Sequence, residues 1–240
     1  MSAFAESFRT AVQLVLEADP VLLRTVRLSL TVSGTACLLA AGFGLAGGAW
    51  LAVTRFPGRQ LLVALLNTLL ALPSVVVGLI VYLLLSRSGP LGAMGILFTP
   101  TAMVIAQTIL VLPVVAALSR QLVSDSLRDG GDQLRSMGAR PFTSALLMML
   151  HERWAVVTVL LTAFGRAVSE VGAVMIVGGN IDGVTRVITT AIALETSKGD
   201  LPLALALGLV LLAIVGIVNA AITVAQRGQR AQGNGLAGVR

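Results

Sequence analysis

Long apolar runs alternate with short charged segments along the chain. Five such runs fall at about residues 28–53, 61–85, 100–119, 154–177 and 203–225. Each is close to or longer than the roughly 20 apolar residues that a helix needs to cross about 30 Å of hydrocarbon. The pattern therefore predicts an all-α, polytopic membrane protein with five transmembrane helices.

A shorter amphipathic segment precedes the first run. Phe4, Phe8, Ala11 and Val15 recur at helical spacing, with polar and charged residues between them. Such a stripe is typical of a helix that lies on a membrane surface or packs against a bundle. Asp19-Pro20 then supplies a helix cap and a proline for the first turn of the next helix. We expect an external amphipathic helix at 1–19, a transmembrane domain at 20–226 and a cytoplasmic tail at 227–240.

Basic residues are divided unevenly between the segments that join the five runs. One set of segments holds ten of them: Arg55, Arg59, Arg120, Arg128, Arg135, Arg140, Arg153, Arg227, Arg230 and Arg240. The opposite set holds six: Arg9, Arg24, Arg27, Arg87, Arg186 and Lys198. Because cytoplasmic segments carry the excess of basic residues, we expect an external N-terminus and a cytoplasmic C-terminus.

Composition excludes several classes of protein. Of 240 residues, 56% are hydrophobic and 12% charged, whereas soluble domains carry about 25% charged residues. The net charge of +6 is spread between apolar runs and few aromatic residues accompany it, which argues against nucleic-acid binding. Cys37 and His151 are the only cysteine and histidine, and no phosphate-binding glycine loop is present. We therefore expect no catalytic site, no metal site and no cofactor in this chain.

The fourth apolar run contains two charged residues, Arg166 and Glu170. An arginine in the middle of a span costs about 2.5–3.5 kcal/mol on insertion scales. Residues four apart lie on one face of a helix, so we expect Arg166 and Glu170 to form an ion pair buried in the bundle. The pair would either orient helices or take part in gating and transport.

Glycine and proline predict close packing and kinks within the runs. Gly44 and Gly48 form a small-xxx-small pair that lets two helices approach closely. Packing within one subunit is favoured over a dimer face for this pair. Pro73 and Pro113 each remove a backbone donor and kink the helix, either for packing or beside a water-filled path.

The least apolar part of the chain, residues 120–153, contains a recognisable motif. Its stretch Asp132-Gln-Leu-Arg-Ser-Met-Gly138-Ala139 resembles the coupling loop of ABC importer permeases, E-A-A-x-x-x-G. Asp132 stands at the glutamate position and Gly138 at the glycine, while Gln133 and Leu134 replace the two alanines. The resemblance implies a cytoplasmic coupling helix that docks on an ATPase through Asp132, Ser136, Gly138, Ala139 and Arg140.

A second motif lies in the fourth run. Residues 164–173, Phe-Gly-Arg-Ala-Val-Ser-Glu-Val-Gly-Ala, resemble the F-x-R-A-x-x-E-x-G-A signature of molybdate, sulfate and tungstate permeases. The segments 177–186 and 189–200 are most similar to the tungstate branch. The resemblance covers about residues 20–226 and implies the type I ABC importer permease fold in a prokaryotic cytoplasmic (inner) membrane.

The family also implies partners. Two permease copies would form a homodimeric pore in the lipid, two cytoplasmic ATPase subunits would bind ATP and Mg²⁺, and an external oxyanion-binding protein would deliver the anion. Two alternatives stay open: a molybdate or sulfate permease of the same family, and a gradient-driven carrier.

The polar residues that follow the second motif suggest a route for the anion. Conduction requires sites weak enough to release the ion, and neutral hydroxyl, amide and backbone N–H donors meet that requirement. The alternative is that these groups only cap helices and bond to one another. The predicted path residues are Ser169, Gly178, Gly179, Asn180, Thr185, Thr189 and Thr190.

Overall fold

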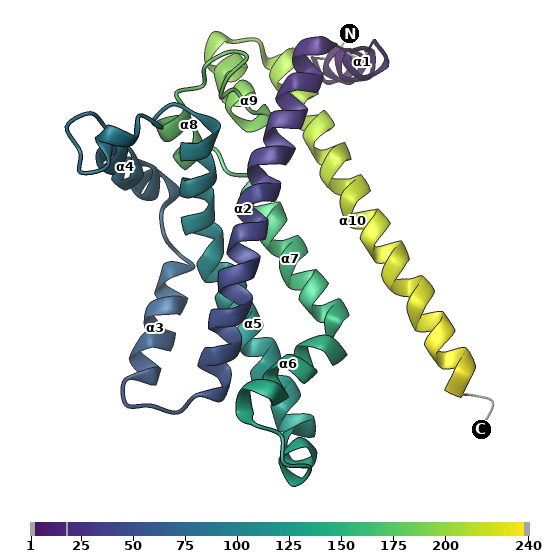
Figure 1. The fold of residues 1–240 in the computed structure, drawn as a ribbon. Coiled ribbons are helices and arrows are strands. Elements are labelled where there is room, and N and C mark those ends of the chain that lie inside the picture. Colours follow the sequence, from purple (N-terminus) through teal and green to yellow (C-terminus); the bar gives the residue numbers. More distant parts are fainter. Residues whose placement is uncertain (1–2, 18, 238–240) are drawn as a thin grey trace. The chain divides into compact units, whose positions relative to one another are not determined.

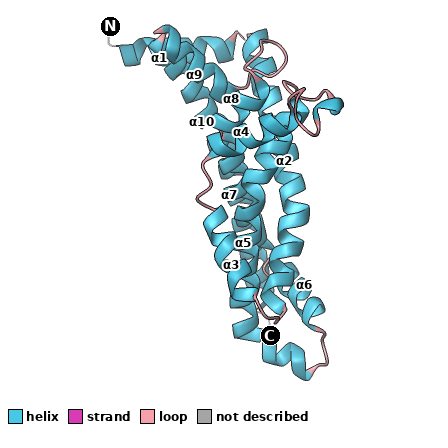
Figure 2. Cartoon of the chain, turned by 90° about the vertical axis from the view of Figure 1, so that its left-hand side faces the viewer, coloured by secondary structure: helices cyan, strands magenta, loops and turns pink. Residues whose placement is uncertain are grey.

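A computed structural model describes residues 3–17 and 19–237, which form helices, turns and loops without a strand (Figures 1 and 2). The chain divides into two compact units, residues 20–190 and residues 1–19 with 191–240. The elements are α1 Ala3–Leu16, α2 Pro20–Val53, α3 Arg59–Leu69, α4 Ser74–Leu85, the 3-10 turn η1 Gly92–Met94, α5 Pro100–Ser136, α6 Pro141–His151, α7 Arg153–Val168, α8 Gly172–Gly178, α9 Ile188–Lys198 and α10 Leu201–Ala237.

The all-α, polytopic fold class is confirmed. Within the described residues, α2, α5 and α10 are each long and apolar enough to cross a membrane by themselves. The helix pairs α3–α4 and α6–α7 reach that length only together, and they bend by 99° and 81° at the breaks between them. Counting each bent pair as one span gives five spans, the expected number, although α6 lies in the segment expected to be the coupling loop.

Two spans differ from their expected limits. The third was expected to end near residue 119, but α5 continues to Ser136. The first half of segment 120–153 is therefore a continuation of the third helix and not a loop. The fourth was expected to run to residue 177, but α7 ends at Val168 and a separate short helix, α8, follows.

The unit of residues 20–190 is built around the contact between α2 and α5, which run side by side (Figure 1). A Cβ on Gly48 would overlap the Ser119 hydroxyl and the Ala116 carbonyl, and one on Gly44 would lie 2.8 Å from Val115 Cβ. Ser119 Oγ also donates to the Gly44 carbonyl at 3.1 Å. The glycine pair therefore packs within one subunit, as favoured from the sequence.

The two intramembrane prolines act differently. Pro73 has an extended backbone and directly precedes α4 at the sharp break after α3. Pro113 lies inside the continuous helix α5 and is buried. Pro113 therefore serves packing within the subunit, whereas Pro73 divides a span.

Two apolar cores contact successive parts of α5. One joins α2, α4, α5 and α8 and includes Val32, Val81, Met103 and Val174. The other joins α2, α5 and α7 and includes Cys37, Val115 and Ala163. Large apolar side chains such as Leu38 and Leu61 are about three-quarters exposed, as expected for a surface whose solvent is lipid.

In the second unit, α1 packs against α10. Ser7 and Ala11 are the buried described residues of α1, whereas Phe8, Val12, Val15 and Leu16 are exposed. Phe8 and Val15 of the predicted stripe are thus exposed and available to a membrane surface, whereas Ala11 is buried. The helix α10 continues without a break past residue 226 to Ala237, so no change of structure separates the expected tail from the span.

Candidate functional site

The predicted coupling residues form a sharp turn between α5 and α6. Gly138 has a φ of 79°, in the left-handed region that glycine enters without strain. The amide of Ala139 donates to the Leu134 carbonyl at 3.0 Å. A left-handed residue just beyond the helix, with this six-residue bond, is the Schellman motif that ends many helices. Gly138 is therefore required by the backbone of the turn.

The turn presents its residues outward. Asp132, Ser136, Gly138 and Arg140 are exposed and Ala139 is half-buried, so the structure brings the five predicted residues together at one end of the unit. Two exposed apolar residues, Met137 at 77% and Phe142 at 56%, flank them. The sequence motif assigns these two no docking role, although large apolar side chains exposed beside polar ones are a signal of a protein contact.

The structure does not pair Arg166 with Glu170. The helix α7 ends at Val168, so the four-residue spacing no longer places the two side chains on one helical face. Arg166 is exposed, and none of the described residues forms an ion pair with it. Glu170 is 8% exposed, and its Oε1 accepts the Ala173 amide at 3.2 Å at the beginning of α8. The expected buried ion pair is therefore wrong.

Three of the predicted path residues are held inside the fold. Thr185 Oγ1 accepts the Ile181 amide at 2.9 Å and donates to the Gly178 carbonyl. Thr189 Oγ1 donates to the Glu170 carbonyl at 2.8 Å, and Thr190 Oγ1 donates to the carbonyl of Val187 at 3.0 Å. All three are buried. Their hydroxyls stabilise the loop between α8 and α9 and do not line an open path. This agrees with the alternative interpretation, in which these groups bond to one another.

The other predicted path residues divide into exposed and enclosed groups. Ser169 and Gly179 are exposed, but the Ser169 hydroxyl donates to the Arg166 carbonyl at 3.2 Å and the Gly179 amide donates to the Met175 carbonyl at 3.0 Å. Gly178 is buried. Asn180 donates its Nδ2 to the Thr190 carbonyl at 3.3 Å, and its Oδ1 is buried without a partner.

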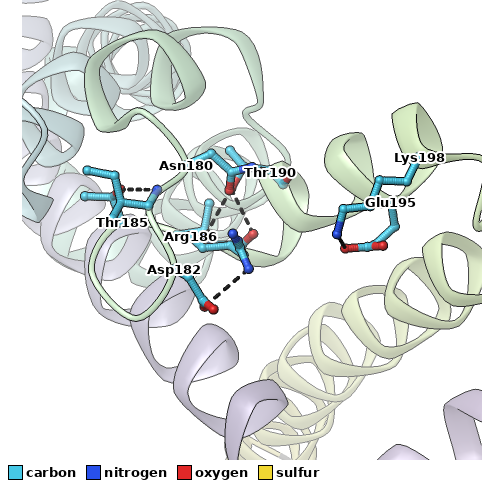
Figure 3. Close-up of polar contacts among 9 residues, drawn as sticks. Asn180, Asp182, Thr185, Arg186, Thr190, Glu195 and Lys198 are labelled. Atoms are coloured by element: carbon cyan, nitrogen blue, oxygen red, sulfur yellow. Dashed lines mark hydrogen bonds and ion pairs between the residues drawn. The ribbon is translucent and has the colours of Figure 1, made fainter.

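Arg186, one of the basic residues that indicate the topology, is also a functional candidate. It pairs with Asp182 at 3.2 Å (Figure 3), while its Nε is buried without a hydrogen-bond partner. Arg186, Asp182 and Arg24 share a pocket of about 390 Å³ between the beginning of α2 and the loop after α8. A basic residue within a Gly- and Thr-rich loop was the available signal.

No family model matches the chain, but curated relatives do. It is 43% identical over 222 residues to a tungstate uptake system permease protein of Peptoclostridium acidaminophilum, covering 92% of this chain and 97% of the relative. It is 45% identical to a probable anion ABC transporter permease protein of Haloferax volcanii, covering 80% and 85%. The chain belongs to the oxyanion permeases of ABC transporters.

Other members of this permease family are more distant. The sulfate transport system permease protein CysW of Escherichia coli is 33% identical, covering 76% of this chain and 66% of the relative. The relatives are named as transporter subunits, so the chain is a multi-pass membrane subunit and not an enzyme. Membership of this family is consistent with an exposed turn at 136–140 for docking and with the absence of a nucleotide loop from the sequence.

Proposed function

We propose that the chain is the translocating subunit of an ATP-driven tungstate importer. The observation that carries this is similarity along almost the whole chain to two tungstate uptake permeases, at 43% identity over 92% of the chain and 38% over 89%. The sulfate permease of Escherichia coli matches at 33% over 76%. Identity and coverage both favour tungstate over sulfate.

The proposed assembly contains two permease copies, an ATPase dimer that binds ATP and Mg²⁺, and an external oxyanion-binding protein. The exposed Schellman turn with Met137 and Phe142 beside it supports ATPase docking. The excess of arginine at that end of the spans supports a cytoplasmic turn and C-terminus and an external N-terminus.

Arg166 supports a path between two permease copies. It is exposed in the last turn of α7 and unpaired among the described residues, and an arginine exposed to lipid within a span is costly, by about 2.5–3.5 kcal/mol at its centre. We place this face of α7 against the second copy and a water-filled path. Ser169, on the same exposed surface, would lie beside it, whereas the three buried threonines are no longer part of the proposed path.

The substrate is tested by reconstituting the permease with its ATPase and binding protein in vesicles. ATP hydrolysis should be stimulated by tungstate at lower concentrations than by molybdate or sulfate. Stronger stimulation by molybdate or sulfate would reassign the substrate within the family.

The gradient-driven alternative is separated by uptake itself. An ATPase partner that binds but cannot hydrolyse ATP should abolish tungstate uptake into the same vesicles. Uptake that persists and follows an imposed proton or sodium gradient would instead identify a carrier.

A further inference from the structure

A basic pocket adjoins the coupling turn. Its volume is about 560 Å³, and it lies among the end of α2, the α2–α3 loop, α5 and the beginning of α6. Arg55, Arg59 and Arg128 line it, and no carboxylate is among its described lining residues. Three guanidinium groups around one cavity favour an anion, because Arg binds phosphate oxygens through several parallel donors.

Three side chains of the pocket have donors that are not used within the described residues. Ser144 lines it, is 4% exposed, and has a buried Oγ without a hydrogen-bond partner. Among the described residues, Arg128 pairs only with the exposed Asp125, at 3.5 Å. Arg59 is oriented by the bond from its Nε to the Leu51 carbonyl at 3.0 Å, which leaves its terminal nitrogens for a ligand. A buried hydroxyl without a partner indicates a missing polar group.

An apolar groove lies along the neighbouring turns of α2 and α6. Its volume is about 330 Å³. No polar or charged side chain lines it: its residues are Ala41, Gly42, Leu45, Ala46, Ala49, Phe142, Ala145, Leu146 and Met149. On α2, Ala52 and Val53 of the basic pocket follow Ala49 by one turn, and on α6 Ser144 precedes Ala145.

The groove has the length of an acyl chain segment. Its α2 residues span positions 41–49, or about 12 Å at 1.5 Å per residue. That is close to half of the ~30 Å hydrocarbon thickness, which is one leaflet. A ligand that fills both cavities therefore has an anionic head and an apolar tail that reaches into one leaflet.

We propose that the two cavities form a binding site for one anionic phospholipid. The headgroup phosphate bonds to Arg55, Arg59 and Arg128 and to the Ser144 hydroxyl, and one acyl chain lies in the groove against α2 and α6. Basic pockets between helices at the cytoplasmic surface are suited to such headgroups. A free oxyanion would satisfy the arginines but leave the groove empty.

The site has a route to the docking surface. Ala139 and Pro141 line the basic pocket, and both belong to the turn and helix that follow Gly138. A bound headgroup therefore holds the beginning of α6 against the ends of α2 and α5. We expect anionic lipid to raise coupled ATP hydrolysis by stabilising this turn.

The test measures lipid retained by the intact permease–ATPase assembly after equal delipidation in mixed micelles of phosphatidylglycerol and phosphatidylcholine with identical acyl chains. Mass spectrometry should find phosphatidylglycerol retained several-fold over phosphatidylcholine. The double variant Arg55→Gln/Arg128→Gln should lower phosphatidylglycerol retention about tenfold or more, because each basic residue near the headgroups contributes strongly to anionic lipid binding. The control Arg153→Gln removes an exposed charge that does not line the pocket. It should leave the retention of phosphatidylglycerol unchanged.

The groove is tested separately by Gly42→Leu. A side chain here meets no atom within 4 Å of its Cβ and enters the groove, whereas Gly47 on the same helix is equally free but does not line it. Gly42→Leu should reduce retention of phosphatidylglycerol and Gly47→Leu should not, with both assemblies eluting normally on gel filtration.

Three results would overturn the proposal. Equal retention of both lipids by the wild type would show that charge plays no part. Equal losses in variant and control would show a non-specific effect. If inorganic phosphate or tungstate displaced phosphatidylglycerol, and Gly42→Leu retained as much phosphatidylglycerol as the wild type, the pocket would be a site for a free oxyanion. Because the readout is bound lipid, it is independent of which anion the transporter carries.

Discussion

Glu170 contacts two helices, one through its side chain and one through its backbone. Its carboxylate accepts the Ala173 amide at the beginning of α8, and its carbonyl accepts the Thr189 hydroxyl from α9. A carboxylate at the beginning of a helix satisfies a free amide and interacts favourably with the helix dipole. Its burial is therefore explained without a cationic partner.

A double-mutant cycle tests this role. Glu170→Ala should lower the free energy of unfolding in detergent by about 1–3 kcal/mol, because it leaves a buried amide unbonded. Glu170→Gln keeps an acceptor and should cost less. With Arg166→Ala as the second change, the coupling energy should stay below about 0.5 kcal/mol, as for residues without contact. A coupling energy well above 1 kcal/mol would instead support a direct ion pair between the two residues.

Gly138 provides a second prediction for a single residue. Gly138→Ala should reduce tungstate-stimulated ATP hydrolysis, since a Cβ at a φ of 79° adds about 1 kcal/mol of strain and shifts the turn. Gly138→Asn should retain more activity because asparagine tolerates this region.

The matched control for Gly138 is Gly34→Ala. Gly34 lies in α2, its Cβ would meet nothing within 4 Å, and its φ is not positive. Stimulation should remain at the wild-type level in this variant. If tungstate stimulated ATP hydrolysis equally in the wild type and in Gly138→Ala, the turn would have no role in coupling.

The sequence predicted part of the candidate site, and the limits have a physical cause. Gly138 was predictable because a glycine after a helical run is a common helix end. The threonines at 185, 189 and 190 were misassigned because a hydroxyl near a membrane has the same sequence pattern whether it faces water or a backbone carbonyl. The prediction of the ion pair was wrong because it assumed a continuous helix through Arg166 and Glu170. The end of α7 at Val168 is not marked by a proline and depends on tertiary contacts.

At the scale of elements, the close contact of α2 with α5 gives a sharp pair of variants. Gly48→Ala should destabilise the protein by about 1–3 kcal/mol, because the added methyl overlaps the Ser119 and Ala116 atoms and the core must shift. Gly47→Ala, one residue away, meets no atom within 4 Å and should be neutral.

Thermal denaturation in detergent, with the yield of folded protein, measures both glycine variants. Ser119→Ala/Gly48→Ala should recover part of the loss, since it removes the atom nearest the new methyl. Equal stability of the two single variants would contradict the packing of α2 on α5.

The breaks within spans were unequally predictable. Pro73 made the break between α3 and α4 predictable, because proline has no backbone N–H to donate to the preceding turn. The break between α6 and α7 falls at Glu152, close to the expected beginning of the fourth span at 154, but the apolar helix α6 before it was expected to be part of the loop. Hydropathy finds apolar length, but the direction of a helix after a charged surface residue depends on packing.

At the scale of the whole molecule, the orientation in the membrane is the main prediction. Single cysteines at Ala5 and Ala231, in a Cys37→Ala background, report the two ends. An impermeant thiol reagent on whole cells should label position 5 and not position 231, because the basic residues favour a cytoplasmic C-terminus.

Permeabilised cells provide the control, since both cysteines should then react. Labelling of position 231 but not of position 5 in intact cells would reverse the topology. The native Cys37 is buried and contacts the Leu160 carbonyl at 3.6 Å, so its removal to alanine should be tolerated.

The unbroken course of α5 has a mechanical consequence. From Pro100 to Ser136 it is a single rod of 37 residues, about 55 Å long. One end meets the coupling turn, and near the other Met103 fits against Gly178, where an added Cβ would lie 3.1 Å from its side chain. A movement of the turn would therefore be carried along α5 to the loop after α8, and α5 would bend most easily at Pro113, its interior proline, where a backbone hydrogen bond is missing.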